Sequence, residues 1–406
     1  MKKLCVLALV WAGCGPLSVG PDGGLPDAGP TVVREDAPDQ PLRGATQAQL
    51  DRFDEGDALF DLPFRAADGL GPLYIRNACS ACHEEAGRGS GKVEKVVVVE
   101  ADGSTIAADQ SALPYGNTVR PYYLSPATAP LLAPSMVKLK ISERVGPPLF
   151  GRGYLEAISD AEILRVEAEQ ATRTDGIRGK VNRVVYHSEP NPDDHAPSYL
   201  KGQGNLIGRF GLKARVATLT DFTADAFQGD MGMTSPMRPT EVPNAEGVTD
   251  DQHPGVDADL HLVNAVSDYL RLIEIPRRAP ATAEAKNLFA QARCDGCHVP
   301  SLRTRADYPV PQLANIDAPI YADLLLHDMG EALADGLVDE QATSAQWRTA
   351  PLIGLRFLRT YLHDGRARTV EEAVLAHAGE GADSRARFVA LSEDQRAVLL
   401  KFVQSL

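Results

Sequence analysis

Four cysteines and two histidines form the two motifs with the clearest chemistry in this sequence. They are Cys79-Ser80-Ala81-Cys82-His83 and Cys294-Asp295-Gly296-Cys297-His298. The C-x-x-C-H pattern is the attachment signature of c-type haem, in which both thiols bond to the porphyrin and the histidine ligates the iron. A redox dithiol or a zinc ribbon would use the cysteines but would explain neither histidine. The sequence therefore predicts two covalently bound haem c groups, with His83 and His298 as metal ligands.

The N-terminal residues indicate the cellular compartment. The two other cysteines, Cys5 and Cys14, lie in a leader that has a basic start and a short apolar run. Residues 1–13 therefore predict a lipoprotein signal peptide, with Cys14 as the lipidated N-terminus. Bacterial haem c is attached outside the cytoplasmic membrane, so we expect a lipid-anchored protein of the cell envelope that faces the periplasm. Gly15 favours the outer membrane, and plain secretion to the periplasm is the alternative.

Charge and composition narrow the classes of partner. The net charge is −14, which argues against nucleic acid as a partner. An acidic surface suits a small basic electron donor, and it also serves simple solubility. Residues 14–45 are rich in glycine, proline and aspartate, so they predict a flexible tether between the lipid and the folded part.

The residues between the tether and residue 275 predict an N-terminal haem domain, residues 46–275. A β-branched run at 96–99 predicts a strand, which a second strand at 104–108 would pair with as a β-hairpin insertion. Residues 170–250 are rich in loop-forming residues. We therefore expect a domain that insertions have enlarged.

Residues 276–406 predict a compact C-terminal domain. An amphipathic helix at 283–293 leads directly into Cys294, and capping-box patterns at Thr369 and Ser392 predict two later helices. A helix, a haem loop and a terminal helix are the plan of cytochrome c. The predicted fold class is therefore mainly α, with two cytochrome c-like haem domains, the first enlarged by loop and β-hairpin insertions.

Six further motifs stand in an order that resembles the di-haem oxidoreductase family of peroxidase-like proteins. That family is distantly related to the bacterial di-haem cytochrome c peroxidases and to the methylamine dehydrogenase maturation enzyme. The motifs are Gly146-Pro-Pro-Leu-Phe, Leu155-Glu-Ala-Ile, Gly208-Arg-Phe-Gly, Asp230-Met-Gly, Leu326-His-Asp-Met-Gly and Leu362-His-Asp-Gly-Arg-Ala. The resemblance covers about residues 46–406. The chain departs from the family pattern at Leu212, because relatives often have tryptophan after the Gly-Arg-Phe-Gly motif. A tryptophan bridge between the haems would therefore have to use Trp347.

The resemblance implies a division of labour between the two haems. In the relatives, the N-terminal haem meets peroxide and the other haem, which is six-coordinate, stores and passes electrons. His83 would then hold the reactive iron and His298 the electron-transfer iron. Cleavage of peroxide needs a group that moves a proton, for which we expect Glu156, with Arg152 stabilising negative charge. From the residues alone, Glu156 is as well explained by a pair with Arg152 or by a place on a turn.

The sixth ligand of the second haem should be methionine or histidine. Met329 is the first choice, and His327 and His363 are the alternatives. Core packing is the plainer explanation for Met329, and a hydrogen bond to a propionate is the plainer one for His363. The remaining histidines are expected to be solvated or to cap helices: His187, His195, His253, His261 and His377.

The predicted function is that of a di-haem c-type oxidoreductase with peroxidase-like activity. It would reduce hydrogen peroxide with electrons from a small soluble cytochrome c or cupredoxin. A non-enzymatic electron-transfer lipoprotein, with both irons capped, is the alternative from a different class. A haem oxidase or oxygenase that acts on another substrate is a further alternative.

Overall fold

The computed structural model describes residues 37–196, 199–248 and 255–406. The predicted signal peptide at 1–13, the tether as far as residue 36 and His253 lie outside these residues. Residues 36–406 form one compact unit. Among the helices of the described residues, none combines the length and the hydropathy that a membrane span requires.

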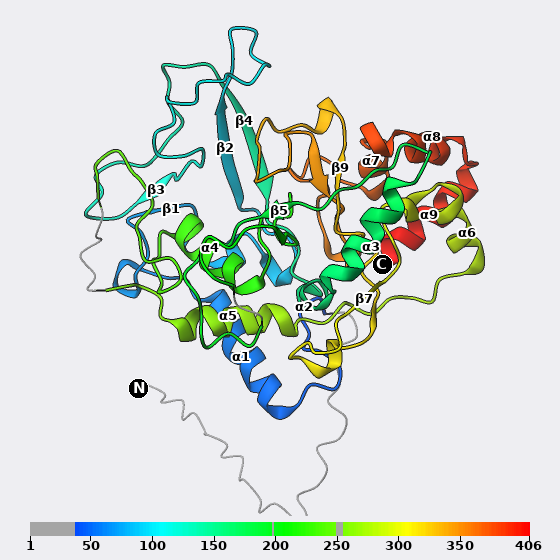
Figure 1. Cartoon of the computed structure of the whole chain (residues 1–406), viewed down its shortest axis with the longest axis horizontal. Coiled ribbons are helices and arrows are strands. Elements are labelled where there is room, and N and C mark those ends of the chain that lie inside the picture. Colours follow the sequence, from blue (N-terminus) through cyan, green and yellow to red (C-terminus); the bar gives the residue numbers. More distant parts are fainter. Residues whose placement is uncertain (1–36, 197–198, 249–254) are drawn as a thin grey trace, which may run out of the picture. The chain divides into compact units, whose positions relative to one another are not determined.

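The fold is a mixture of helices and short strands (Figure 1). Of the described residues, 33% are helical when 3-10 turns are included, and 14% lie in strands or isolated bridges. The predicted mainly α fold is therefore confirmed only in part: the structure is mixed, and more residues lie in helices than in strands. The helices are α1 (Gln47–Asp61), α2 (Arg152–Ala157), α3 (Asp160–Ala171), α4 (Leu219–Met231), α5 (Leu260–Leu272), α6 (Ala283–Gln291), α7 (Val370–Leu375), α8 (Ala382–Ala390) and α9 (Glu393–Ser405).

The strands of the described residues pair as two-stranded antiparallel sheets. The pairs are β1 (Leu73–Tyr74) with β3 (Tyr122–Tyr123), β2 (Lys92–Val98) with β4 (Leu139–Val145), β5 (Arg183–Val184) with β6 (Leu206–Ile207), β7 (Leu302–Arg303) with β8 (Asp317–Ala318), and β9 (Leu326–Asp328) with β10 (Gln346–Arg348). A two-stranded sheet is marginal alone in water, so these sheets depend on the helices and loops around them.

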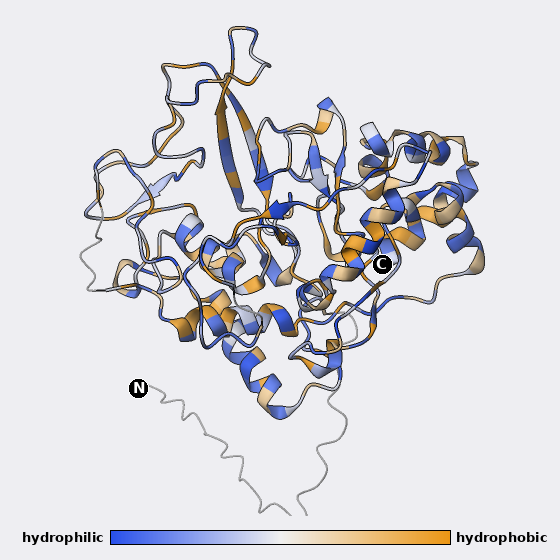
Figure 2. Ribbon diagram, viewed as in Figure 1, coloured by the Kyte–Doolittle hydropathy of each residue, from blue (hydrophilic) through white to orange (hydrophobic). Residues whose placement is uncertain are grey.

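Side-chain caps fix where the predicted helices begin. The Thr369 hydroxyl accepts the N–H of Glu372 at the start of α7, and Ser392 forms a full capping box with Gln395 at the start of α9. Both capping predictions are confirmed, as is the helix that leads into Cys294, which is α6. Figure 2 shows both hydrophobic and hydrophilic residues along α5 and α9, as expected of helices with one apolar face.

Aromatic contacts hold the helices together in two groups. Phe53 of α1 packs against Tyr269 of α5 with ring centroids 5.1 Å apart, and Phe289 of α6 meets Phe402 of α9 edge-on at 5.6 Å. One hydrophobic core nevertheless includes residues from Leu42 to Leu406. The division into domains at residues 275 and 276 stays a prediction.

The predicted strand at 96–99 largely coincides with β2, and residues 104–108 return beside its end only over a short stretch. β2 pairs along its length with β4, whereas the return consists of the bridge between Val99 and Ile106 and two backbone bonds, from Ala107 to Val98 and from Glu100 to Thr105. The Gln110 amide adds bonds to the backbone of Val98, accepting from its N–H and donating to its carbonyl. The run of β-branched residues identified the strand but carries no information about β4, a partner much further along the chain.

Two glycines within helices give a paired test of packing. A Cβ on Gly56 of α1 would lie 2.3 Å from the carbonyl oxygen of Ala265 and 2.5 Å from the Cβ of Tyr269, whereas a Cβ on Gly229 of α4 would meet nothing within 4 Å. We predict that Gly56→Ala lowers the free energy of unfolding by about 1–3 kcal/mol through overpacking. Gly229→Ala should instead raise it by about 0.5–1 kcal/mol through helix propensity.

Denaturant unfolding followed by circular dichroism measures both changes. Equal effects of the two substitutions would contradict the close packing of α1 against α5.

Candidate functional site

The first motif forms a tight turn that directs its histidine at a backbone carbonyl. A 3-10 turn spans Cys79–Ala81, and Nδ1 of His83 lies 2.9 Å from the carbonyl oxygen of Pro147. Because a carbonyl only accepts, Nδ1 carries the proton and Nε2 keeps a free lone pair. Burial lowers the pKa of His83 to about 4. The ring is therefore neutral, as a metal ligand must be.

The glycine of the Gly146-Pro-Pro motif makes this contact possible. A Cβ on Gly146 would lie 2.7 Å from the carbonyl oxygen of Cys82 and 2.8 Å from Cε1 of His83. A side chain at this position would push the chain away from the histidine and move the Pro147 carbonyl out of range. The motif is thus explained by close approach of the backbone.

The four motif thiols are free and do not resemble those of a redox-active dithiol. Burial raises the pKa of Cys79 to about 12 and that of Cys82 to about 11, and it likewise raises the pKa of Cys294 to about 12. Reactive cysteines in C-x-x-C motifs have lowered pKa values. The chemistry of these donors fits thiols that bond to a cofactor, with the histidine beside them as ligand.

A pocket opens beside the first motif, with about 100 Å³ of space for the centres of water-sized molecules. Cys79, Cys82 and His83 line the pocket, as do Phe210, Leu149 and Arg152. Its wall is thus largely apolar, with a few polar groups.

One face of α4 supplies much of this wall. Its pocket-lining residues recur at helical spacing, three or four residues apart, and so share one face: they are Leu219, Phe222, Thr223, Ala226, Phe227 and Asp230. The helix ends at Gly232, which has a φ of 71°, and a Cβ there would lie 2.5 Å from the carbonyl oxygen of Leu73. The Asp230-Met-Gly motif therefore combines a pocket residue with the end of its helix.

Asp230 is a pocket residue that the sequence reasoning missed as a site candidate. Its carboxylate forms no hydrogen bond or ion pair with another side chain among the described residues. Burial raises the pKa of Asp230, and the nearby Asp225 raises it further. In the sequence, the Asp230-Met-Gly motif contributed only to the family resemblance. An acidic residue shortly before a glycine that ends a helix was a signal that could have marked Asp230 as a site residue.

Arg152, predicted to stabilise charge, does line the pocket. Burial lowers the pKa of Arg152 to about 9, and the neighbouring Arg348 and Arg88 lower it further. None of these three arginines, of which Arg152 and Arg348 are buried, forms an ion pair with a carboxylate within 37–196, 199–248 and 255–406. Buried charges without a counter-charge are costly, so the cluster fits a cofactor that brings its own anions, as haem does with its propionates.

Glu156, predicted to move a proton, does not line the pocket. Its carboxylate accepts from Arg271 at 2.7 Å, from the Tyr308 hydroxyl at 2.8 Å and from the backbone N–H of Leu219 at 2.8 Å. Burial opposes ionisation, but the Arg271 guanidinium and these hydrogen bonds hold the pKa of Glu156 below its usual value. Glu156 is therefore an ionised, fully bonded group that ties α2 to the start of α4.

The second motif repeats the geometry of the first. A 3-10 turn spans Cys294–Gly296 directly after α6, and Nδ1 of His298 lies 3.1 Å from the carbonyl oxygen of Tyr321. Burial lowers the pKa of His298 to about 4. Nε2 of a neutral ring is again free, so both predicted metal-ligand histidines have the tautomer that ligation needs.

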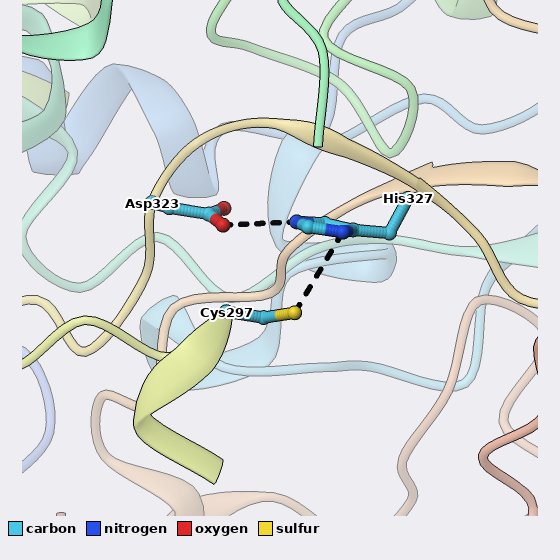
Figure 3. Close-up of side chains that lie close together, drawn as sticks. All are labelled: Cys297, Asp323 and His327. Atoms are coloured by element: carbon cyan, nitrogen blue, oxygen red, sulfur yellow. Dashed lines mark hydrogen bonds and ion pairs between the residues drawn. The ribbon is translucent and has the colours of Figure 1, made fainter. Parts of the chain in front are cut away.

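His327, one alternative for the sixth ligand, is held between two carboxylates. Its Nε2 lies 2.9 Å from Asp323 and its Nδ1 2.7 Å from Glu380, while the Sγ of Cys297 lies 3.7 Å from Nδ1 (Figure 3). The two carboxylates outweigh burial and hold the pKa of His327 well above its usual value. Both ring nitrogens of His327 are thus paired with carboxylates, so neither is free to ligate a haem iron without losing one of these partners.

His363, the other alternative, stacks on the ring of Trp347 with centroids 3.9 Å apart. The Lys213 ammonium lies 4.2 Å from the centroid of Trp347. The Trp347 indole donates to the carbonyl of Leu333. Neither Trp347 nor His363 lines the first pocket.

His377 is the histidine that the sequence reasoning undervalued. Its Nδ1 lies 2.8 Å from the carbonyl oxygen of Ala373, which leaves Nε2 free. After burial, His377 is the strongest influence that lowers the pKa of His298. A Cβ on Gly381 would lie 3.1 Å from the Cβ of His377 and 3.2 Å from Cε of Met329. His377 and Met329 thus lie on either side of the same glycine.

The chain belongs to the family described as "Di-haem oxidoreductase, putative peroxidase", whose profile matches residues 127–406. This match includes the second haem motif and the Glu156 and Asp230 regions. The first motif, at Cys79, precedes the matched residues. No curated protein sequence matches the chain.

Solved structures with partial likeness include a hydrazine synthase of Kuenenia stuttgartiensis, at 11% identity over 100% of both chains with a TM-score of 0.37. The diheme peroxidase BthA from Burkholderia thailandensis shares 13% identity over 91% of this chain and 87% of its own, with a TM-score of 0.37. A MauG-like protein associated with microbial copper homeostasis shares 14% identity over 61% of this chain and 89% of its own, with a TM-score of 0.30. Likeness at this level carries no conclusion about this chain.

Two alanine variants separate the candidates for the sixth ligand of a haem at His298. Because His377 has a free Nε2 and acts electrostatically on His298, we predict that His377→Ala opens this iron and that the reduced protein then binds additional carbon monoxide. Met329→Ala should bind no more than the parent protein. Met136→Ala, at a residue 92% exposed, is the control, and the absorption spectrum is the measurement. Additional binding in Met329→Ala alone would contradict the assignment and restore the sequence-based choice.

Proposed function

We propose that the protein is a di-haem c-type oxidoreductase with peroxidase-like activity. Cys79, Cys82 and His83 would hold a reactive haem, and Cys294, Cys297 and His298 an electron-transfer haem. The proposal goes beyond the family in assigning covalent attachment and a separate role to each haem.

The single observation that carries the proposal is the contrast between the two histidines. The pocket beside His83 has unfilled space and a wall with polar groups, namely Thr223 and Asp230 on α4. His298 instead is influenced electrostatically by His377, whose Nε2 is free. In the proposed division of labour, the iron at His83 would keep an open position and the iron at His298 would take a second ligand from the protein.

Bound haem supplies iron that exchanges electrons with the substrate. Reduction of one hydrogen peroxide to two waters consumes two electrons and two protons, so the pocket must also deliver protons. Asp230 is the carboxyl best placed to do so, because it lines the pocket and its pKa is raised by burial. Arg152 offers a buried positive charge in the same pocket, in line with the stabilising role predicted for it.

Glu156 remains a sequence-based candidate for proton transfer, and its contacts suggest a positioning role. To carry a proton, it would first have to lose the guanidinium of Arg271 or the Tyr308 hydroxyl. Its bond to the N–H of Leu219 holds the first turn of α4, the helix that lines the pocket. We therefore propose that Glu156 acts through the position of α4 and that Asp230 handles the proton.

The electron donor and the location are part of the proposal. A net charge of −14 suits a small basic cytochrome c or cupredoxin as donor. Covalent haem attachment and a leader that ends at Cys14 support a lipid-anchored protein on the periplasmic side of the outer membrane, or one secreted to the periplasm.

Carbon monoxide binding to the reduced protein tests the proposal. We predict that half of the total haem responds, because only the iron at His83 has an open position, and that the same preparation consumes hydrogen peroxide in the presence of a reduced donor. Absorption difference spectroscopy against a haem standard measures the fraction. No response would favour a non-enzymatic electron-transfer protein, and a response of all the haem would contradict the division of labour.

A further inference from the structure

The segment that precedes α1 is bonded to the end of α5. The N–H of Glu274 donates to the carbonyl of Gln40, and the N–H of Leu42 donates to the last residue of α5. The side chain of Leu42 is buried. The segment is thus anchored firmly from Gln40 onwards, and residues 37–39 depend on further contacts.

The carboxyl of Asp39 supplies those contacts, because it lies between α5 and α1. The Tyr269 hydroxyl of α5 donates to Oδ2 of Asp39 at 2.7 Å. The side chains of Asp39 and Asp57, the latter on α1, are hydrogen-bonded to each other. Oδ1 of Asp39 is shielded from solvent and has no other donor among the described residues. Two carboxyls form a hydrogen bond only if one of them carries a proton, so this contact requires a shared proton.

The surroundings of the two carboxyls favour that proton. Burial raises the pKa of Asp39 to about 6 and also raises the pKa of Asp57. Asp61 raises the pKa of both carboxyls further, and Asp54 raises that of Asp57. The Tyr269 hydroxyl acts in the opposite direction, with less effect than burial. Two carboxyls that share a site in this way do not both ionise readily.

Positive charge that could replace the proton is engaged elsewhere or absent. Arg43, in the same segment, bonds to Glu274 through its Nε and its backbone N–H. His83 lies nearby, but burial lowers its pKa to about 4 and leaves its ring neutral. Neither Asp39 nor Asp57 forms an ion pair with a basic side chain of the described residues. Ionisation of both carboxyls would therefore place two unbalanced negative charges together.

This contact closes one side of a second cavity, which lies beside His83. The cavity has about 290 Å³ of space for the centres of water-sized molecules. Residues 37–39 line it on one side, and Asp61 and Glu85 add further acidic groups to its wall. A polar cavity of this size holds water. Movement of residues 37–39 would join this water to the solvent outside.

We propose that Asp39 and Asp57 share one proton that fastens residues 37–39 over this cavity, and that loss of the proton as the pH rises releases the segment and opens the cavity. The fastening is strong at low pH and weakens as the pH rises through about 6, because the pKa of Asp39 is raised in the fastened state. The inference goes beyond the proposed function and requires no peroxide chemistry.

Amide hydrogen exchange of the haem-loaded protein tests the proposal at the N–H of Glu274, which bonds to Gln40 beside Asp39. With a pKa of about 6 when fastened and about 3.9 when released, the ratio of fastened to released protein should fall about tenfold between pH 5 and pH 7. The exchange rate at Glu274, corrected for the intrinsic effect of pH, should rise by the same factor.

Two variants separate the shared proton from other effects of pH. Asp39→Asn places an amide that donates to Asp57 at either pH, so protection of Glu274 should be equal at pH 5 and pH 7, and Asp57→Asn should act likewise. Asp51→Asn, at an exposed residue of α1, is the control and should keep the tenfold change. Equal protection at both pH values in the parent protein would overturn the inference, as would an undiminished pH dependence in either pair variant. Neither result would affect the proposed function.

Discussion

A backbone carbonyl fixes which nitrogen of each motif histidine is available to a metal, and the rest of the site chemistry depends on this choice. Pro147 accepts from His83 and Tyr321 accepts from His298, so both rings keep Nε2 free. Burial keeps both rings neutral. The two carbonyls come from segments 64 and 23 residues away, so the folded chain must be in place before either histidine is oriented. Gly146 shows the local requirement, because a side chain there would break the contact to His83.

The two sites share this arrangement but differ in what surrounds it. Beside His83, α4 provides an apolar wall with the polar groups of Thr223 and Asp230, and a pocket remains. His298 has no such pocket among the described residues, and it is influenced electrostatically by His377, which lies with Met329 at Gly381. Glu156 links α5 to the start of α4, since its carboxylate bonds both to Arg271 of α5 and to the first turn of α4. Glu156, which the sequence predicted to move a proton, thus has contacts that suit a residue supporting the pocket wall.

The sequence predicted those features that depend on local pattern. The C-x-x-C-H motifs predicted both turns, and the capping residues Thr369 and Ser392 predicted the starts of two helices, because these signals involve residues three or four apart. The family was recognised from the order of its motifs. The pairing of β2 with β4 was not predictable, because β4 lies much further along the chain and the expected return at 104–108 extends over only a few residues.

The features of the candidate site that the sequence did not predict also depend on contacts between residues far apart in the chain. His377 was expected to be solvated or to cap a helix, and only the folded structure reveals its influence on His298. The sequence placed Glu156 among apolar neighbours but could not reveal Arg271, which is 115 residues away. Likewise, the three arginines without acidic partners become informative only when their burial is known. Long-range contacts, not residue types, separate a reactive group from a supporting one.

The intact mass of the protein after denaturation and solvent extraction tests the central claim most directly, namely that the four motif cysteines each bond to haem. For protein made in a bacterium that matures cytochromes c, we predict a polypeptide carrying two haem masses, and replacement of Cys79 and Cys82 by alanine should remove one of them. A polypeptide that retains no haem mass under these conditions would contradict the claim.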